Sequence, residues 1–370
     1  MKTTRILVIG GYGLFGRLLV ERLSSQPNLH ITIAGRSAKP ARQLINRLKH
    51  AKAELSMSVL DTMATALRGK LLGLAPDIVV NAAGPFQGQD YRIAQLCIAL
   101  GVHYLDLADG REFVQGIEEL DSYAKAAGVL VISGASTLPA LSSAAADRLT
   151  DNMATVQTLD IGICPGNRVE RGLSTIQAVL SYCGKEVPCM TGETRYGWSG
   201  SYPHRYPAPV NGRKLSYCDT PDLVLMASRY EGRPQVRVGA GLELGLFHYG
   251  MNFMSWLTRT GLVPDWPRNA KWLKRVSDWF RVFGSDAGAM HVTAVGRCSA
   301  GLTVSRTWHL VATQGQGTYV PTLAAAALVR KLAEGTLTKT GAMPCLGLLT
   351  LEDFEREAQG LRITMGENLK

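Results

Sequence analysis

Short apolar runs alternate with longer amphipathic runs along the first 150 residues of the chain. Six short apolar runs predict strands, and they lie at 5–10, 30–36, 53–61, 77–84, 103–109 and 129–135. The amphipathic stretches between them predict helices. Parallel strands need a crossover connection, and right-handed crossovers place helices on both faces of a sheet. The pattern therefore predicts a doubly wound parallel sheet of the α/β class.

A glycine cluster follows the first predicted strand and opens the first predicted helix. It reads G-x-G-x-x-G, in the context that this motif requires. Gly11 allows a tight turn, Gly13 lets the backbone approach a pyrophosphate, and Gly16 lets the helix pack closely on the strand. The first helical residues, Leu14 and Phe15, offer free N–H groups and the positive end of the helix dipole to phosphate. The cluster predicts a dinucleotide cradle, and the alternative is a turn that only reverses the chain.

The end of the second predicted strand indicates which dinucleotide binds. An NAD site usually has a carboxylate about 20 residues after the glycines, where it accepts from the ribose 2′-hydroxyl. This chain has Arg36 and Ser37 there, with Lys39 close by and no carboxylate. A guanidinium and a hydroxyl suit a 2′-phosphate. The sequence favours NADP(H) over NAD(H), unless Arg36 is only a solvated residue at the end of a strand.

Two more strand ends point to the same crevice, because ligands of open α/β sheets lie at the carboxyl ends of the strands. Asp61 ends the third predicted strand and is placed to meet the adenine edge of the dinucleotide. The fourth strand ends in Asn-Ala-Ala-Gly-Pro-Phe. The small residues Ala82, Ala83 and Gly84 let the backbone approach the ribose and nicotinamide side, and Pro85 stiffens the turn.

Hydride transfer usually needs an acid or base for the accompanying proton. Asp109 is the strongest candidate by position, at the end of the fifth predicted strand. Strand alternation places Asp106 and Asp109 on opposite faces, and the alternative for Asp109 is to cap the helix that follows. Tyr104 and His204 are weaker candidates.

Two other kinds of chemistry are disfavoured. None of the twelve tyrosines is followed by lysine four residues later, which argues against a short-chain dehydrogenase. Cys164 lacks a neighbouring histidine that would activate it, so it is better read as a structural thiol than as a nucleophile. A non-catalytic NADP-binding sensor or scaffold remains the alternative to an enzyme.

The motifs together resemble the saccharopine dehydrogenase-like family of NADP-binding oxidoreductases. The resemblance rests on "NAAGPF", 101–110 and 134–149, and extends more loosely through 163–175, 240–245, 284–290, 315–321 and 341–354. It implies a Rossmann NADP-binding domain at 1–150, an α+β substrate and dimerisation domain on a mixed sheet at 151–317, and a C-terminal segment, 318–370, that returns to the first domain. It also implies a homodimer, and hydride transfer to or from an imine, an amino-acid-like compound or another small substrate.

Local patterns in the second half agree with an α+β domain. Strand-like residues lie at 155–164, a helical pattern at 172–184, and two further runs, 290–298 and 303–313, predict an antiparallel hairpin. A helix follows Pro321 and ends at Gly335.

Four of the six tryptophans lie between residues 241 and 283. The apolar stretch 244–263 contains His248, Arg259 and glycines, so it is a poor bilayer span. Residues 268–283 predict an amphipathic helix with an apolar set and an opposed basic set, namely Trp272, Leu273, Val276, Trp279, Phe280 and Phe283 against Lys271, Lys274, Arg275 and Arg281. Three roles fit: core or dimer packing with a solvated basic face, peripheral contact with an anionic membrane, or a lid over an apolar substrate.

The composition of the chain limits the kinds of partner and site that we expect. The net charge of +10 favours anionic partners, but the 40 basic residues are spread along the chain without a nucleic-acid-reading motif. Seven cysteines form no C-x-x-C pair and no Cys/His cluster, so neither a disulfide framework nor a metal site is expected. The first residues lack the features of a signal peptide, and we expect a cytoplasmic protein.

Overall fold

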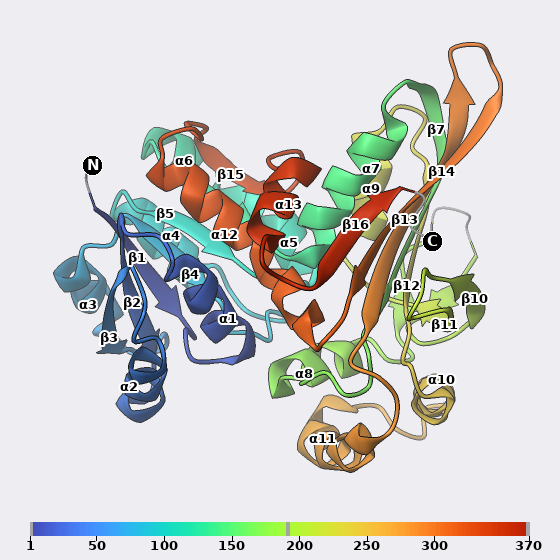
Figure 1. Cartoon of the computed structure of the whole chain (residues 1–370), viewed down its shortest axis with the longest axis horizontal. Coiled ribbons are helices and arrows are strands. Elements are labelled where there is room, and N and C mark those ends of the chain that lie inside the picture. Colours follow the sequence, from blue (N-terminus) through green and yellow to red (C-terminus); the bar gives the residue numbers. More distant parts are fainter. Residues whose placement is uncertain (1–2, 190–192, 368–370) are drawn as a thin grey trace. The chain divides into compact units, whose positions relative to one another are not determined.

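The computed structural model describes residues 3–189 and 193–367 and divides the chain into two compact units (Figure 1). The first unit contains the described residues up to Ala140 together with Tyr319–Leu349. The second contains Leu141–Thr318 together with the described residues from Thr350 onward. Each unit is therefore assembled from two separate stretches of the chain.

The first unit is built on a seven-stranded sheet in the order β15-β6-β5-β4-β1-β2-β3. Every neighbouring pair is parallel, which confirms the predicted doubly wound sheet. The strands are β1 (Thr4–Ile9), β2 (Leu29–Gly35), β3 (Glu54–Val59), β4 (Ile78–Asn81), β5 (His103–Asp106), β6 (Leu130–Ser133) and β15 (Gly341–Pro344).

Helices cover this sheet because its strands are apolar on both faces. Leu7 and Val79 point to one face, where they share a core with residues of α3, α4 and α6, while α1 and α12 pack against each other. The helical segments are α1 (Leu14–Leu23), α2 (Ala38–Arg47), α3 (Leu67–Leu74), α4 (Arg92–Ala99), α5 (Arg111–Gly116), η1 (Ile117–Leu120), α6 (Asp121–Ala126) and α12 (Val320–Ala333). A short helical turn, η2 (Thr137–Leu141), spans the division between the units.

The seventh strand is an addition that the hydrophobic pattern does not predict. β15 comes from the returning segment and pairs with β6, with Ala342 opposite Val131. It is only four residues long, and it contains a glycine and a proline. Such a short edge strand is recognisable only from its pairing, since neither residue type favours a strand.

The second unit is built on a mixed seven-stranded sheet in the order β10-β11-β12-β7-β13-β14-β16. Only β12 and β7 are parallel. The strands are β7 (Met153–Cys164), β10 (Tyr202–Arg205), β11 (Gly212–Tyr217), β12 (Gln235–Ala240), β13 (Gly288–Cys298), β14 (Thr303–Ala312) and β16 (Ile363–Glu367), and β8 (Glu186–Val187) and β9 (Arg195–Tyr196) form a separate pair. The α/β fold with a second domain on a mixed sheet is therefore confirmed, as is the predicted hairpin of β13 and β14.

The two faces of the mixed sheet differ in character. One face carries apolar residues such as Ile161 and its register partners Val238 and Val292, and helices α7 and α9 pack on the strands of this sheet. The opposite face carries Asp160 and His291, which follow the strand alternation. The polar residues therefore lie on the face opposite Ile161, beside a buried apolar cluster that includes Cys164, Leu215 and Ala289.

The helical segments of the second unit are α7 (Ser142–Thr150), α8 (Leu173–Ser181), α9 (Asp222–Arg229), α10 (Gly245–Arg259), η3 (Pro267–Asn269), α11 (Ala270–Trp279), η4 (Phe280–Val282) and α13 (Leu351–Ala358), and η5 (Gln316–Tyr319) crosses into the first unit. Of these, α8, α10 and α11 lie beyond the strand ends of the mixed sheet (Figure 1). Among the described residues, no helix combines the length and the apolar character needed to cross a bilayer.

Candidate functional site

The glycine cluster forms a close turn between β1 and α1. Gly10 has a φ of +74°, its carbonyl oxygen accepts from the N–H of Gly13 at 2.8 Å, and Gly13 is the N-cap of α1. A Cβ added at Gly16 would overlap the backbone of Gly10, so glycine is required for the helix to approach the strand this closely. The first-turn N–H groups, from Leu14 and Phe15 onward, have no acceptor within the helix and are available to phosphate.

The loop after β4 lies against this turn. Strand order reverses at β1 and β4, so the switch point of the sheet lies at their carboxyl ends. The N–H of Ala82 donates to Ile9 at 2.8 Å, and the backbone of Ala83 lies next to Gly10. Ala82, Ala83, Gly84 and Pro85 are partly exposed at this point. The structure thus places the predicted β4 residues beside the glycine turn.

The end of β2 carries a group of unpaired polar side chains. Arg36, Lys39 and the hydroxyl of Ser37 have no hydrogen-bond or ion-pair partner within the described chain, and all three residues are exposed. Ser37 is also the N-cap of α2, with no side-chain cap bond. Two positive charges and a hydroxyl therefore lie together at a helix N-terminus, where an anion is stabilised.

Tyr12 is a residue of this region that sequence reasoning missed. Its hydroxyl accepts from the N–H of Ser37 at 2.9 Å, and its ring lies so close to Gly35 that a Cβ there would collide with it. Tyr12 therefore links the glycine turn to the end of β2. Its position in the motif is one of the variable ones, so the sequence carried no signal for this role.

Asp61 lies two residues beyond the end of β3. It is exposed, and one of its carboxylate oxygens accepts from the N–H of Met63 at 3.0 Å. This bond fixes the loop after β3 and leaves the rest of the carboxylate facing solvent.

Asp109 and Asp106 have different surroundings from those that alternation predicted. β5 ends at Asp106, so Asp109 lies in the following loop and the predicted opposition of faces does not apply. Asp109 accepts from Gln87 Nε2 at 3.1 Å. It keeps exposed surface, yet desolvation by the protein around it raises its pKa, and the Gln87 bond offsets part of this rise. The expected capping role is wrong, because Gly110 is the N-cap of α5 and no side chain caps it.

Asp106 is a structural group. It is fully buried, and one carboxylate oxygen accepts from the N–H groups of Ala108 and Gly134 and from the hydroxyl of Ser133, at 2.9 to 3.0 Å. Burial raises the pKa of Asp106 to about 6. The carboxylate therefore ties the end of β5 to the end of β6.

Two of the other sequence candidates, Tyr104 and Cys164, are buried away from solvent. Tyr104 is 1% exposed, and its hydroxyl accepts from Asn81 Nδ2 at 3.3 Å. Cys164 is fully buried, and burial raises the pKa of its thiol to about 12. A thiol with so high a pKa has almost no thiolate at neutral pH, which agrees with the structural reading.

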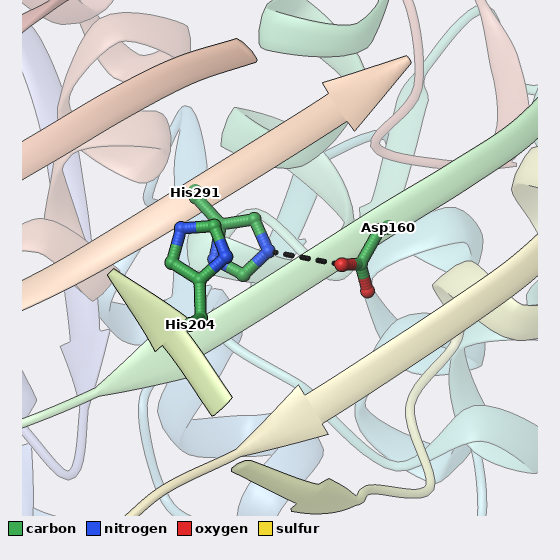
Figure 2. A group of neighbouring side chains, drawn as sticks. All are labelled: Asp160, His204 and His291. Atoms are coloured by element: carbon green, nitrogen blue, oxygen red, sulfur yellow. Dashed lines mark hydrogen bonds and ion pairs between the residues drawn. The ribbon is translucent and has the colours of Figure 1, made fainter. Parts of the chain in front are cut away.

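The polar face of the second unit brings together residues far apart in sequence (Figure 2). Asp160 lies on β7, His291 on β13, and His204 on β10, which crosses over the sheet face. The rings of His204 and His291 stack with centroids 3.5 Å apart and planes 4° apart. Gly162 provides the space, because a Cβ there would collide with the ring of His291.

A chain of hydrogen bonds runs through this group. Arg237 Nε and Nη2 donate to the two carboxylate oxygens of Asp160 at 2.8 and 2.9 Å, His291 Nε2 lies 3.4 Å from Asp160, and His291 Nδ1 lies 3.0 Å from the hydroxyl of Tyr206. Burial favours the neutral carboxyl, but the bonds from His291 and Arg237 outweigh it and hold the pKa of Asp160 below its ordinary value. His204 Nε2 is also 3.3 Å from His309 Nε2 on β14.

The ligand-type atoms of Asp160, His204 and His291 lie within 4.8 Å of one another. The geometry suits an ion pair with Arg237 better than a bound cation, because the guanidinium already occupies both oxygens and would repel a second positive charge. Parallel stacked rings also cannot direct their nitrogen lone pairs at one point. Sequence reasoning found only His204, because the others are single polar positions in alternating strands.

The geometry of the first unit is that of a dinucleotide-binding Rossmann domain. Residues 6–132 match the family model of the saccharopine dehydrogenase NADP binding domain. About a third of the chain is therefore similar to that domain family, and the match supports NADP as the cofactor. No curated protein sequence matches the chain at a significant level.

Solved structures share the fold at low sequence identity. The chain is similar to apo saccharopine dehydrogenase (L-Glu forming) from Saccharomyces cerevisiae, with 14% identity over 98% of this chain and 99% of that chain and a TM-score of 0.67. It is less similar to an amine dehydrogenase from Mycobacterium smegmatis, with 13% identity over 92% and 94% of the two chains and a TM-score of 0.47. The first match shows that this chain shares the fold of that structure.

Proposed function

We propose that the protein is an NADP(H)-dependent oxidoreductase that transfers a hydride to or from an imine, an amino-acid-like compound or another small substrate. One observation carries this proposal: an NADP-binding domain has two cations, Arg36 and Lys39, and the hydroxyl of Ser37 at the end of β2. These side chains have no partner among the described residues. A 2′-phosphate distinguishes NADP from NAD, and this group offers the charge that it needs. The same proposal includes a separate α+β domain, at 151–317, that binds the substrate and forms the dimer.

In this proposal each part of the site has one task. The turn of Gly11, Gly13 and Gly16 and the first N–H groups of α1 hold the pyrophosphate, and Asp61 lies toward the adenine. The backbone of 82–85 borders the nicotinamide side, where bound NADPH supplies a hydride. Asp109 gives or takes the accompanying proton. Its raised pKa supports this task, because a carboxyl that holds its proton closer to neutral pH is a better general acid.

Turnover with a panel of substrates tests the proposal. NADPH oxidation is followed by absorbance with imino acids, keto acids with ammonia, and enoyl and keto lipids, and NADP reduction with amino acids. We expect one class to react, and Asp109→Asn to lower kcat by about 100-fold, within the range for a lost acid-base group, with little change in NADPH affinity. The matched control is Glu112→Gln, an exposed carboxylate three residues away that should keep full activity.

One result would overturn the proposal, and a second would overturn only the role of Asp109. Tight NADPH binding with no turnover of any panel member would support the alternative, a non-catalytic NADP-binding sensor or scaffold. Full activity in Asp109→Asn would remove the proton-transfer role from Asp109 and leave the hydride-transfer proposal in place.

A further inference from the structure

Exposed apolar side chains are concentrated on one segment of the second unit. Among the described residues, fourteen large apolar side chains are exposed, and nine of them lie between residues 246 and 283. We call these nine the α10–α11 apolar surface: Leu246, Tyr249, Phe253, Trp256, Leu262, Trp272, Trp279, Val282 and Phe283. Scattered exposed apolar residues need no explanation, but such a concentration marks an interaction site.

On α10 the exposed residues form a single stripe. Leu246, Tyr249, Phe253 and Trp256 follow one another at intervals of three, four and three residues, which is the spacing of one helix face. They are 66%, 49%, 57% and 50% exposed, in that order. The rings of Phe253 and Trp256 stack on each other with centroids 5.7 Å apart. The outer face of α10 is therefore aromatic and open.

On α11 the tryptophans face outward, which corrects the predicted division into an apolar and a basic face. Trp272 and Trp279 are 63% and 77% exposed, and the exposed Arg275 lies between them on the same face. The helix is held by its other side, where Ala270 is buried and Ser277 accepts a hydrogen bond from Arg171 at 2.8 Å. The core-packing role is therefore wrong for these two tryptophans.

Contacts behind the surface hold the two helices in place. Phe247 of α10 and Phe280 of η4 meet edge to face with centroids 5.2 Å apart. The indole N–H of Trp266 donates to Thr258 Oγ1 at 2.9 Å, and Asn167 Nδ2 donates to the carbonyl of Phe280 at 2.7 Å. The exposed aromatic residues are therefore presented by an anchored scaffold.

The segment is also basic. Residues 244–284 contain six Lys or Arg and two Asp, which gives a net charge of +4. Both acids are already paired inside the segment, Asp265 with Arg268 at 2.7 Å and Asp278 with Lys274 at 2.6 Å. Lys271 and Arg275 have no ion-pair or hydrogen-bond partner among the described residues. Positive charge is thus interspersed with the exposed tryptophans.

We propose that the α10–α11 apolar surface docks onto the surface of an anionic phospholipid bilayer. Tryptophan and other aromatic rings favour the headgroup region, and flanking Lys and Arg are attracted to anionic lipids. A second copy of the chain fits less well, because a two-fold interface through this surface would bring Lys271 and Arg275 of both copies together. The proposal is independent of the proposed function, since it requires neither NADP nor a substrate.

Vesicle co-sedimentation of the full chain tests this proposal. We expect binding to vesicles of phosphatidylglycerol and phosphatidylcholine, and weak binding to phosphatidylcholine alone. The double variant Trp272→Ser, Trp279→Ser should lose at least about tenfold in affinity, because both rings leave the interface. The double variant Lys271→Glu, Arg275→Glu should lose the preference for phosphatidylglycerol. The matched control is Tyr123→Ser on α6, where an equally exposed aromatic ring is removed and binding should not change.

Other outcomes would overturn the proposal. These are failure of the wild-type chain to bind either vesicle, and unchanged binding by the double tryptophan variant. A third is a change from dimer to monomer in that variant without vesicle binding, which would assign the surface to a second copy. NADPH affinity and thermal midpoint are measured on the same samples. Because both tryptophans are exposed, neither quantity should change.

Discussion

At the scale of single residues, Arg36 is the side chain to which we assign the proposed preference for NADP(H) over NAD(H). Its side chain is exposed and unpaired at the end of β2, within the described chain, so it is free to meet a phosphate. Sequence spacing alone singled out this residue and Ser37, because the fingerprint places the ribose-recognising residue about 20 positions after the glycines. The spacing could not find Tyr12, whose hydroxyl holds the backbone of Ser37 through a contact between two loops.

We expect Arg36→Asp to raise the dissociation constant for NADPH by about 100-fold and to change that for NADH far less. The reason is that a charge-assisted contact to the 2′-phosphate is replaced by repulsion, and each tenfold loss corresponds to about 1.4 kcal/mol. Calorimetric titration with both cofactors measures this. Arg47→Asp is the matched control, since it makes the same charge change at the other end of α2. Equal losses in the two variants would place the 2′-phosphate elsewhere.

At the scale of elements, the junction of β1 and α1 depends on the absence of a side chain at Gly16. The motif predicted this close approach, and the structure shows the atoms that require it, the backbone of Gly10. The ends of other elements were less predictable. The fifth strand was expected to reach residue 109 but ends at Asp106, because the carboxylate of Asp106 binds the loop of β6 and turns the chain.

We expect Gly16→Ala to destabilise the protein by about 2 kcal/mol or more and to abolish NADPH binding, because its Cβ would push α1 away from β1. Thermal unfolding and fluorescence titration report the two effects. Gly69→Ala in α3 is the control, since nothing lies within 4 Å of its added Cβ. That variant should gain about 0.5–1 kcal/mol from helix propensity and bind NADPH normally. A normal affinity in Gly16→Ala would contradict the close packing of helix and strand.

At the scale of the whole molecule, segments from the end of the chain complete both units. β15 extends the parallel sheet, and β16 pairs with β14 at the edge of the mixed sheet. The histidine group of the second unit likewise joins strands from three stretches of sequence. Its behaviour in acid is therefore a property of the folded unit as a whole.

We expect the second unit to lose stability as the pH falls below about 6.5. Burial and the neighbouring His291 lower the pKa of His204 to about 3 and that of His309 to about 4. Between these two lowered pKa values and 6.5, the unfolded chain binds more protons than the folded chain. The free energy of unfolding therefore decreases as the pH is lowered through this window. Asp160, Arg237 and Tyr206 also face the group.

Between pH 7 and pH 5 the loss should be about 2 kcal/mol after allowance for partial exposure of both rings. Urea unfolding at several pH values measures it. His204→Gln should flatten the pH dependence, whereas His50→Gln, an exposed histidine of the first unit, should leave it unchanged. An identical slope in His204→Gln and the wild type would remove the histidine group as the cause.

The sequence by itself predicted the parallel sheet, the glycine turn and NADP as the cofactor. These depend on local patterns: apolar runs, crossover connections and a fixed spacing from the glycines to Arg36. The tertiary structure decided the rest, because it depends on contacts between distant segments. Pairing with β6 made 341–344 a strand, strand crossing brought Asp160, His204 and His291 together, and the packing of α11 turned Trp272 and Trp279 outward. Helical periodicity defines a face, but only the neighbouring elements decide which face is covered.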